Sequence, residues 1–164
     1  MYSKFFIFFS IINIKLVTSF YNIKSTNKKF HNILNSHFSR ISTNLKNKDT
    51  LVKSISKVSN CTIFSNSLNV VRGYNGNDVL AEIVIRHNNG VDIGFKLNND
   101  IYEFIADLQF WDQTIPPDFF LEKITQNYAL ETVLESCEEE GFITNSITSN
   151  NKDYIINVEV SRYK

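Results

Sequence analysis

The sequence predicts an α+β fold with an antiparallel β-meander sheet, two helices and a C-terminal β-hairpin. Between residues 79 and 108, three segments of alternating apolar and polar residues follow one another. The turns between them are too short for parallel crossovers, so we expect antiparallel strands. A long segment of helical periodicity follows, and alternation returns in Phe142–Thr148 and Tyr154–Ser161, which predict the hairpin.

The first elements expected along the chain are short. His37–Ile41 alternates weakly and indicates a first strand. A short helix is expected near residues 49–59, with Asp49 as its N-cap. Its apolar stripe consists of Leu51, Val52, Ile55 and Val58. Cys61–Phe64 and Val70–Val71 indicate one or two short strands.

The meander occupies the middle of the chain. Val79–Arg86 is expected to form a single strand. One of its faces is formed by Val79, Ala81, Ile83 and Ile85. His87–Gly90 predicts a turn in which Asn-Gly supplies positive φ, and Val91–Leu97 alternates as a half-buried strand. A second turn at Asn98–Asp100 leads to the third strand, Ile101–Leu108.

A long helix is expected near residues 118–140, opened by Pro116-Pro117 and ended by Gly141. Its apolar stripe changes sides. The first half presents Phe120, Leu121, Ile124 and Tyr128. The second half presents, on the nearly opposite face, Ala129, Leu130, Val133, Leu134 and Cys137. Either the helix bends near Asn127, or its first half meets a second surface such as another subunit.

Charge is unevenly distributed in this formally neutral chain of 164 residues. Residues 1–48 contain eight basic residues and no acid, whereas residues 49–164 contain nine basic and 17 acidic residues. The acidic part argues against nucleic-acid binding, because it repels phosphate. Two cysteines exclude a disulfide scaffold and a four-thiolate metal site built from this chain alone.

The N-terminus is typical of a targeting leader. Residues 1–19 combine a basic end, an apolar run and small residues at Thr18-Ser19, which predicts a secretory signal peptide. Asn13 and Lys15 interrupt the run, so it is too short for a permanent bilayer span. Residues 20–35 are basic, hydroxylated and free of acids, as in transit peptides.

This leader predicts delivery to a complex, apicoplast-type plastid through the secretory route. The alternatives are secretion and an uncleaved amphipathic anchor. Residues 36–164 are then expected to form a single α+β domain. Nothing after Asn35 is long or apolar enough to enter a membrane, so no membrane insertion of the mature domain is expected.

From Ser36 to Ser161 the residues resemble a known family. The resemblance is carried, in order, by Ser36–Ile41, Val71–Tyr74, Ala81–Arg86, Asp92–Phe95, Tyr102-Glu103, Ala106–Trp111, Phe120, Tyr128-Ala129, Val133 and Gly141-Phe142. The family is the uncharacterised cyanobacterial and plastid family called hypothetical chloroplast open reading frame 35, or domain of unknown function 1257. The resemblance implies a plastid protein, and the added leader fits a gene moved to the nucleus. It implies no established activity and no catalytic residues.

Two segments are candidate ligand sites. In the glycine-bearing basic turn Arg72-Gly73-Tyr74-Asn75-Gly76, backbone N–H groups and the guanidinium could hold a phosphate or carboxylate. The turn lacks the lysine and hydroxyl of a P-loop and the spacing of a dinucleotide fingerprint. After the meander, Asp107, Trp111 and Asp112 mix carboxylates with an aromatic ring. The competing interpretations are a tight turn with a solvated arginine and a loop anchored by its aromatic rings.

Other reactive side chains are isolated in the sequence. Cys61 and Cys137 are expected to be reduced thiols, able to pair only if the fold brings them close. His37 and His87 lack clustered ligands at metal-binding spacing. The sequence therefore assigns no catalytic residue, no metal ligand and no cofactor.

The function expected from the sequence is a non-catalytic binding or accessory module of the plastid stroma. Its partner is an unknown protein or a second copy bound through the long helix. The alternative is a small enzyme or anionic-ligand-binding protein that uses Arg72 and the loop from Asp107 to Asp112.

Overall fold

The protein is described by a computed structural model. The described residues are 9–17, 38–59, 61–73, 76, 78–87, 90, 92–111, 113–150 and 155–163. The chain divides into two compact units. The central unit is Asn27–Tyr128, and the C-terminal unit combines Ala129–Lys164 with Met1–Thr26.

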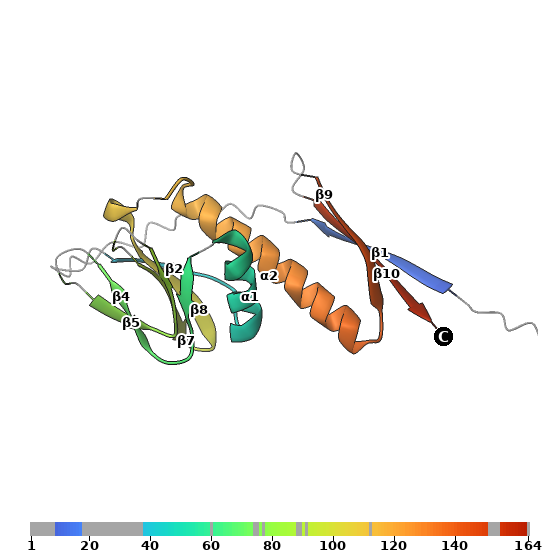
Figure 1. The fold of residues 1–164 in the computed structure, drawn as a ribbon, viewed down its shortest axis with the longest axis horizontal. Helices are drawn as coiled ribbons and strands as arrows, with labels where there is room; N and C mark the ends of the chain where they lie inside the picture. Colours follow the sequence, from blue (N-terminus) through green and yellow to red (C-terminus); the bar gives the residue numbers. More distant parts are fainter. Residues whose placement is uncertain are drawn as a thin grey trace, which may run out of the picture. The chain divides into compact units, whose positions relative to one another are not determined.

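The central unit is built on a five-stranded antiparallel sheet. Its strands, in spatial order, are β2 (Phe38–Ser42), β8 (Ile101–Asp107), β7 (Ile93–Asn98), β6 (Ile83–Arg86) and β3 (Thr62–Phe64). The predicted meander is confirmed as β6, β7 and β8, which pair in sequence order. In Figure 1 this sheet lies between a β-hairpin on one face and α1 on the other.

The strand predicted over Val79–Arg86 is wrong in one respect, because the chain bends at Glu82. The bend separates β5 (Asp78–Ala81), which pairs with β4 (Asn69–Arg72), from β6 in the main sheet. Buried Ala81 therefore packs with Val71 and Val84 under the β4–β5 hairpin. The predicted common apolar face ends there, since the following isoleucines of β6 belong to the opposite face.

The opposite face of the sheet carries the main core. It is covered by α1 (Lys48–Val58) and by the first half of α2 (Pro117–Glu139). The fully buried members include Leu51, Ile55, Ile83, Ile85, Phe95, Phe104 and Ile124. The predicted stripes of both helices are thereby confirmed in this unit.

The N-cap of α1 is Asn47, so the prediction of Asp49 is wrong. The Asn47 side chain accepts hydrogen bonds from the N–H groups of Asp49 and Thr50 at 2.9 and 3.1 Å. Asp49 instead lies in the first turn, where a carboxylate is favoured by the helix dipole. The same helix start is tied to α2, because the Tyr128 hydroxyl accepts the Asn47 N–H at 2.9 Å.

The C-terminal unit has a separate small core. The second half of α2 packs against β9 (Ile143–Asn150) and β10 (Ile155–Tyr163), which form the predicted hairpin. Its buried apolar members are Leu130, Cys137, Ile156, Val158 and Val160. The change of stripe along α2 thus serves two cores, one in each unit. Gly141 ends the helix with φ of +79°.

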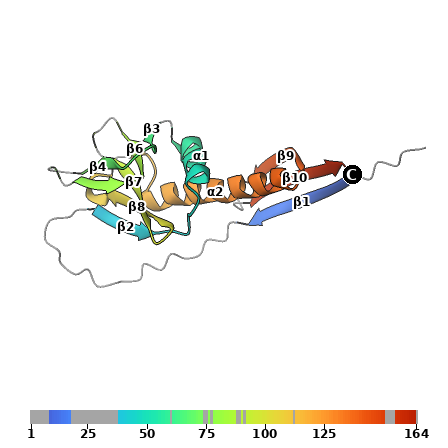
Figure 2. The ribbon, with the colours of Figure 1, turned by 90° about the horizontal axis from the view of Figure 1, so that it is seen from below.

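A third strand, β1 (Phe9–Val17), pairs with β10 and completes the order β1-β10-β9 (Figure 2). These residues lie within the predicted signal peptide, and that assignment remains a prediction. The other residues of the predicted leader, 1–8 and 18–35, lie outside the described part of the chain. Among the described residues, no helix is both long and apolar enough to cross a membrane.

Candidate functional site

The predicted ligand residues of the basic turn begin at the last residue of β4. Arg72 is the last residue of β4, Gly73 comes next, and Gly76 adopts a φ of +77°. Tyr74 lies outside the described residues.

Arg72 is bound to an acid of the chain itself. Its Nε and Nη2 atoms donate to the two carboxylate oxygens of Asp92 at 2.7 and 2.8 Å. The backbone N–H of Arg72 also donates to this carboxylate at 3.1 Å. Asp92 is fully buried, whereas the Arg72 side chain is 41% exposed. The hydrogen bond to Asp92 raises the pKa of Arg72. The Nε and Nη2 edge of the guanidinium, which could hold an anionic ligand bidentately, is therefore occupied by Asp92.

The second predicted segment is built into the core. Asp107 is 1% exposed, and its Oδ1 caps the short 3₁₀ helix η2 (Leu108–Phe110) by accepting the Gln109 N–H at 3.2 Å. The Trp111 indole N–H donates to the Ile115 carbonyl at 2.8 Å. The Trp111 ring contacts Phe104 and Phe120. Asp112 lies outside the described residues. Trp111 thus anchors the loop that leads to α2.

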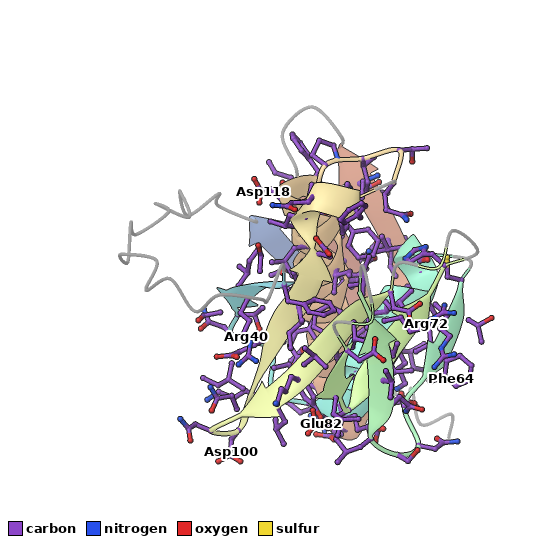
Figure 3. All side chains as sticks on the ribbon, turned by 90° about the vertical axis from the view of Figure 1, so that its left-hand side faces the viewer. Arg40, Phe64, Arg72, Glu82, Asp100 and Asp118 are labelled. Carbon is purple, nitrogen blue, oxygen red and sulfur yellow. The ribbon has the colours of Figure 1, made fainter. Side chains whose placement is uncertain are left out.

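Buried polar atoms without hydrogen-bond partners lie at one end of the five-stranded sheet. Among the described residues, three buried side-chain atoms have no hydrogen-bond partner: Arg86 Nε, His87 Nε2 and Asp107 Oδ2. They belong to the last residues of β6 and β8 and to the residue after β6, so they share this end. Figure 3 shows Arg72 away from Asp100 and Glu82, which mark the other end.

The same end brings together two residues that the sequence showed as isolated. The register of β3 and β6 pairs Thr62 with Arg86, and one position further Cys61 faces His87. Cys61 Sγ lies 3.2 Å from His87 Nδ1. The two residues are 26 positions apart, so no local motif could have revealed the contact. Only the strand register places them together.

A groove marks the C-terminal unit. It has a volume of about 430 Å³ and is lined by Leu134, Glu138, Phe142, Ile143, Thr144 and Ile147. Ile143 and Ile147 are 55% and 46% exposed. The wall of the groove opposite α2 is β9, so both isoleucines project from an edge of the sheet.

Strand β9 is an edge strand that lacks the usual protection. In the described part of the chain its single strand neighbour is β10, so its other side offers unpaired backbone groups. Its eight residues, Ile-Thr-Asn-Ser-Ile-Thr-Ser-Asn, include no charge and no proline. Natural edge strands are commonly blocked by lysine, proline or short length. The candidate functional site is therefore the edge of β9 with its groove. The sequence predicts partner binding through the long helix, and the absence of charge in residues 143–150 is the signal in the sequence that indicates this edge.

Both cysteines are free thiols in the structure. No group of three or more His, Cys, Asp or Glu residues suited to a metal occurs among the described residues.

Comparison with known proteins places the chain in a family. Residues 62–157 match the family described as protein of unknown function (DUF1257). The chain is similar to uncharacterized protein ycf35 of Guillardia theta, with 42% identity over 107 residues, and of Cyanophora paradoxa, with 30% identity over 115 residues. Each alignment covers 65% of this chain and 82% of the relative. No solved structure matches the chain. Since the match spans more than half of the sequence and includes nearly all of the central sheet, the chain belongs to the DUF1257 family.

Proposed function

We propose that the chain is a plastid protein that acts as a non-catalytic binding module, and that it binds an extended segment of a partner protein along β9. The observation that carries this proposal is the uncharged, eight-residue edge strand beside an apolar groove. Strand addition to an open sheet edge is an established mode of peptide recognition.

The edge and the groove supply complementary parts of the binding energy. A partner strand gains backbone hydrogen bonds from β9, which give affinity for any extended chain. Alternate side chains of that strand point to one face of the sheet, where the groove offers Leu134, Phe142 and Ile147. The partner segment is therefore expected to carry apolar residues at every second position.

Charged residues at the rim of the groove influence which partner segments bind. Glu138 lines the groove, Glu139 is the last residue of α2 and Glu140 follows the helix, and all three are exposed. These carboxylates favour basic residues in the partner, whereas Arg162, whose guanidinium carbon lies 5.6 Å from the ring centre of Phe142, favours an acidic residue at that point of the groove. Such rim charges govern the association rate and specificity more than the affinity.

Plastid localisation is supported by the relatives. The chain is similar to ycf35 proteins of Guillardia theta and Cyanophora paradoxa, and the sequence resembles a plastid family. The basic end and apolar run of residues 1–19 support entry by the secretory route, and the acid-free residues 20–35 support a transit peptide. A fluorescent fusion of residues 1–48 tests this step; export of the fusion to the medium contradicts it.

The binding proposal is tested by co-purification of the tagged full chain with proteins of a plastid extract. Ile147→Asp places a charge in the groove at a half-exposed position, so the fold is expected to persist. We expect recovery of the partner to fall at least about tenfold, because a buried unpaired carboxylate opposes docking.

Leu80→Asp is the matched control, because Leu80 is 51% exposed and lies on β5 in the central unit. Recovery with this variant is expected to equal that of the unmodified chain. Equal recovery with Ile147→Asp and the unmodified chain overturns the proposal.

A further inference from the structure

The thiol of Cys61 has a built-in proton acceptor. Its Sγ lies 3.2 Å from Nδ1 of His87, a distance at which the thiol can donate a hydrogen bond. His87 is 9% exposed, and its other ring nitrogen, Nε2, is buried without a hydrogen-bond partner. Cys61 itself is half-buried, so part of this residue is open to solvent, whereas Cys137 is buried. A cysteine beside an imidazole is the arrangement that activates a thiol for attack.

We propose that Cys61 is a site of oxidation by hydroperoxides, with His87 as the base. This inference is independent of the binding function proposed for β9. In the step, Nδ1 of His87 accepts the thiol proton and the sulfur attacks one peroxide oxygen. A sulfur–oxygen bond forms as the oxygen–oxygen bond breaks. The sulfur loses two electrons and becomes a sulfenic acid, and the peroxide is reduced. With hydrogen peroxide, the proton on Nδ1 passes to the departing hydroxide, which leaves as water.

Burial favours the uncharged form of His87, in which one ring nitrogen keeps a lone pair for the thiol proton. Burial lowers the pKa of His87, and the charge of Asp92 opposes this shift. Asp92 is itself bound bidentately by Arg72, which compensates its charge. Arg86, the preceding residue, lies over the ring of Phe64, with its guanidinium carbon 4.8 Å from the ring centre. At neutral pH the imidazole is therefore uncharged, as a general base must be.

The second cysteine of the chain, Cys137, serves as an internal reference for the reactivity of Cys61. Cys137 is 8% exposed and packs in the apolar cluster of the C-terminal unit. A thiol buried in apolar surroundings is a poor nucleophile, because its charged form is disfavoured. The rate at Cys61 can thus be compared with the rate at Cys137 in one sample.

The experiment treats the full chain with hydrogen peroxide and traps sulfenic acid with a dimedone probe, followed by mass spectrometry of each cysteine. We expect Cys61 to be labelled at least about tenfold faster than Cys137 at pH 7. His87→Gln is expected to slow Cys61 by about tenfold to a hundredfold and to leave Cys137 unchanged. The emission of Trp111, the single tryptophan, reports whether the central unit of this variant is folded.

A pH profile of the unmodified chain gives a second measurement that needs no variant. If His87 is the base, the rate at Cys61 reaches its plateau with a midpoint at or below pH 6.5, the ordinary value for imidazole. A thiol that ionises unaided reaches half its maximal rate near about pH 8.5. A Cys61 rate that reaches half its maximum near about pH 8.5 overturns the proposal. Equal labelling of the two cysteines overturns it as well. An unchanged Cys61 rate in a folded His87→Gln chain contradicts it too.

Discussion

Asp92 is a carboxylate that the central unit buries completely and pairs with an arginine. Its carboxylate is fully buried and accepts three hydrogen bonds from Arg72, two from the guanidinium and one from the backbone N–H. Arg72 in contrast is 41% exposed and can be solvated without its partner. The two residues therefore tie the end of β4 to the start of β7, but they depend on each other unequally.

This asymmetry predicts unequal effects of substitution. Arg72→Met leaves a buried carboxylate without a counter-charge and is expected to lower the free energy of unfolding by about 2–4 kcal/mol. Asp92→Asn keeps an acceptor and leaves an arginine that water can reach, so its effect is expected to be smaller. Denaturant unfolding of both variants checks the order. A larger loss in Asp92→Asn contradicts this account of the pair.

At the residue scale, the sequence indicated which side chains to consider as candidates, but it did not indicate which residues they contact. Arg72, Asp107 and Trp111 were predicted as ligand residues, and the structure shows each of them hydrogen-bonded within the chain. Their partners could not be predicted, because Asp92 is 20 positions from Arg72 and is selected by strand pairing. The Cys61–His87 contact could not be predicted either, because it also depends on strand pairing.

At the element scale, Gly94 is where the β4–β5 hairpin approaches the main sheet. A Cβ at this position would lie 2.5 Å from Cγ2 of Val71 and 3.2 Å from Cβ of Ala81. Val71 and Ala81 are fully buried, so neither side chain can move into solvent. Only glycine on β7 allows the hairpin to cover this face of the sheet.

Gly94→Ala is therefore expected to reduce the free energy of unfolding by about 1–3 kcal/mol through overpacking. Thermal or denaturant unfolding measures the change. Val71→Ala removes the methyl group that the new Cβ meets, so the double variant is expected to lose less stability than the sum of the two single variants. Additive losses show that the close approach is not the cause.

Helices and strands could be predicted from the sequence where a single periodicity of apolar residues continues along the whole element. The alternation of Ile93–Asn98 and Ile101–Asp107 and the two stripes of α2 were read correctly, because each residue faces a single core. The bend at Glu82 was missed, since alternation of period two continues through it. The cap of α1 was misplaced by two positions, because Asn47 and Asp49 are both good cap residues and only the hydrogen bonds distinguish them.

At the scale of the whole molecule, charge is divided unequally along the chain. The neutral total conceals a basic N-terminal segment and an acidic remainder. The division into two compact units was not predicted, although the change of stripe along α2 was its signal. Strand β1 was also not predicted. Its alternate residues Ile12, Ile14 and Leu16 are in register with buried residues of β10, so an apolar leader segment also has the pattern of a strand.

The central claim is that β9 accepts a partner strand, and amide hydrogen exchange of the full chain tests it most directly. The measurement compares Ile143–Asn150 with and without the co-purified partner, using β3 as the internal reference. Strand addition gives the outward N–H groups of β9 new acceptors, so their exchange is predicted to slow at least about tenfold while β3 is unchanged. Saturation with partner and no change in the exchange of β9 would contradict the claim.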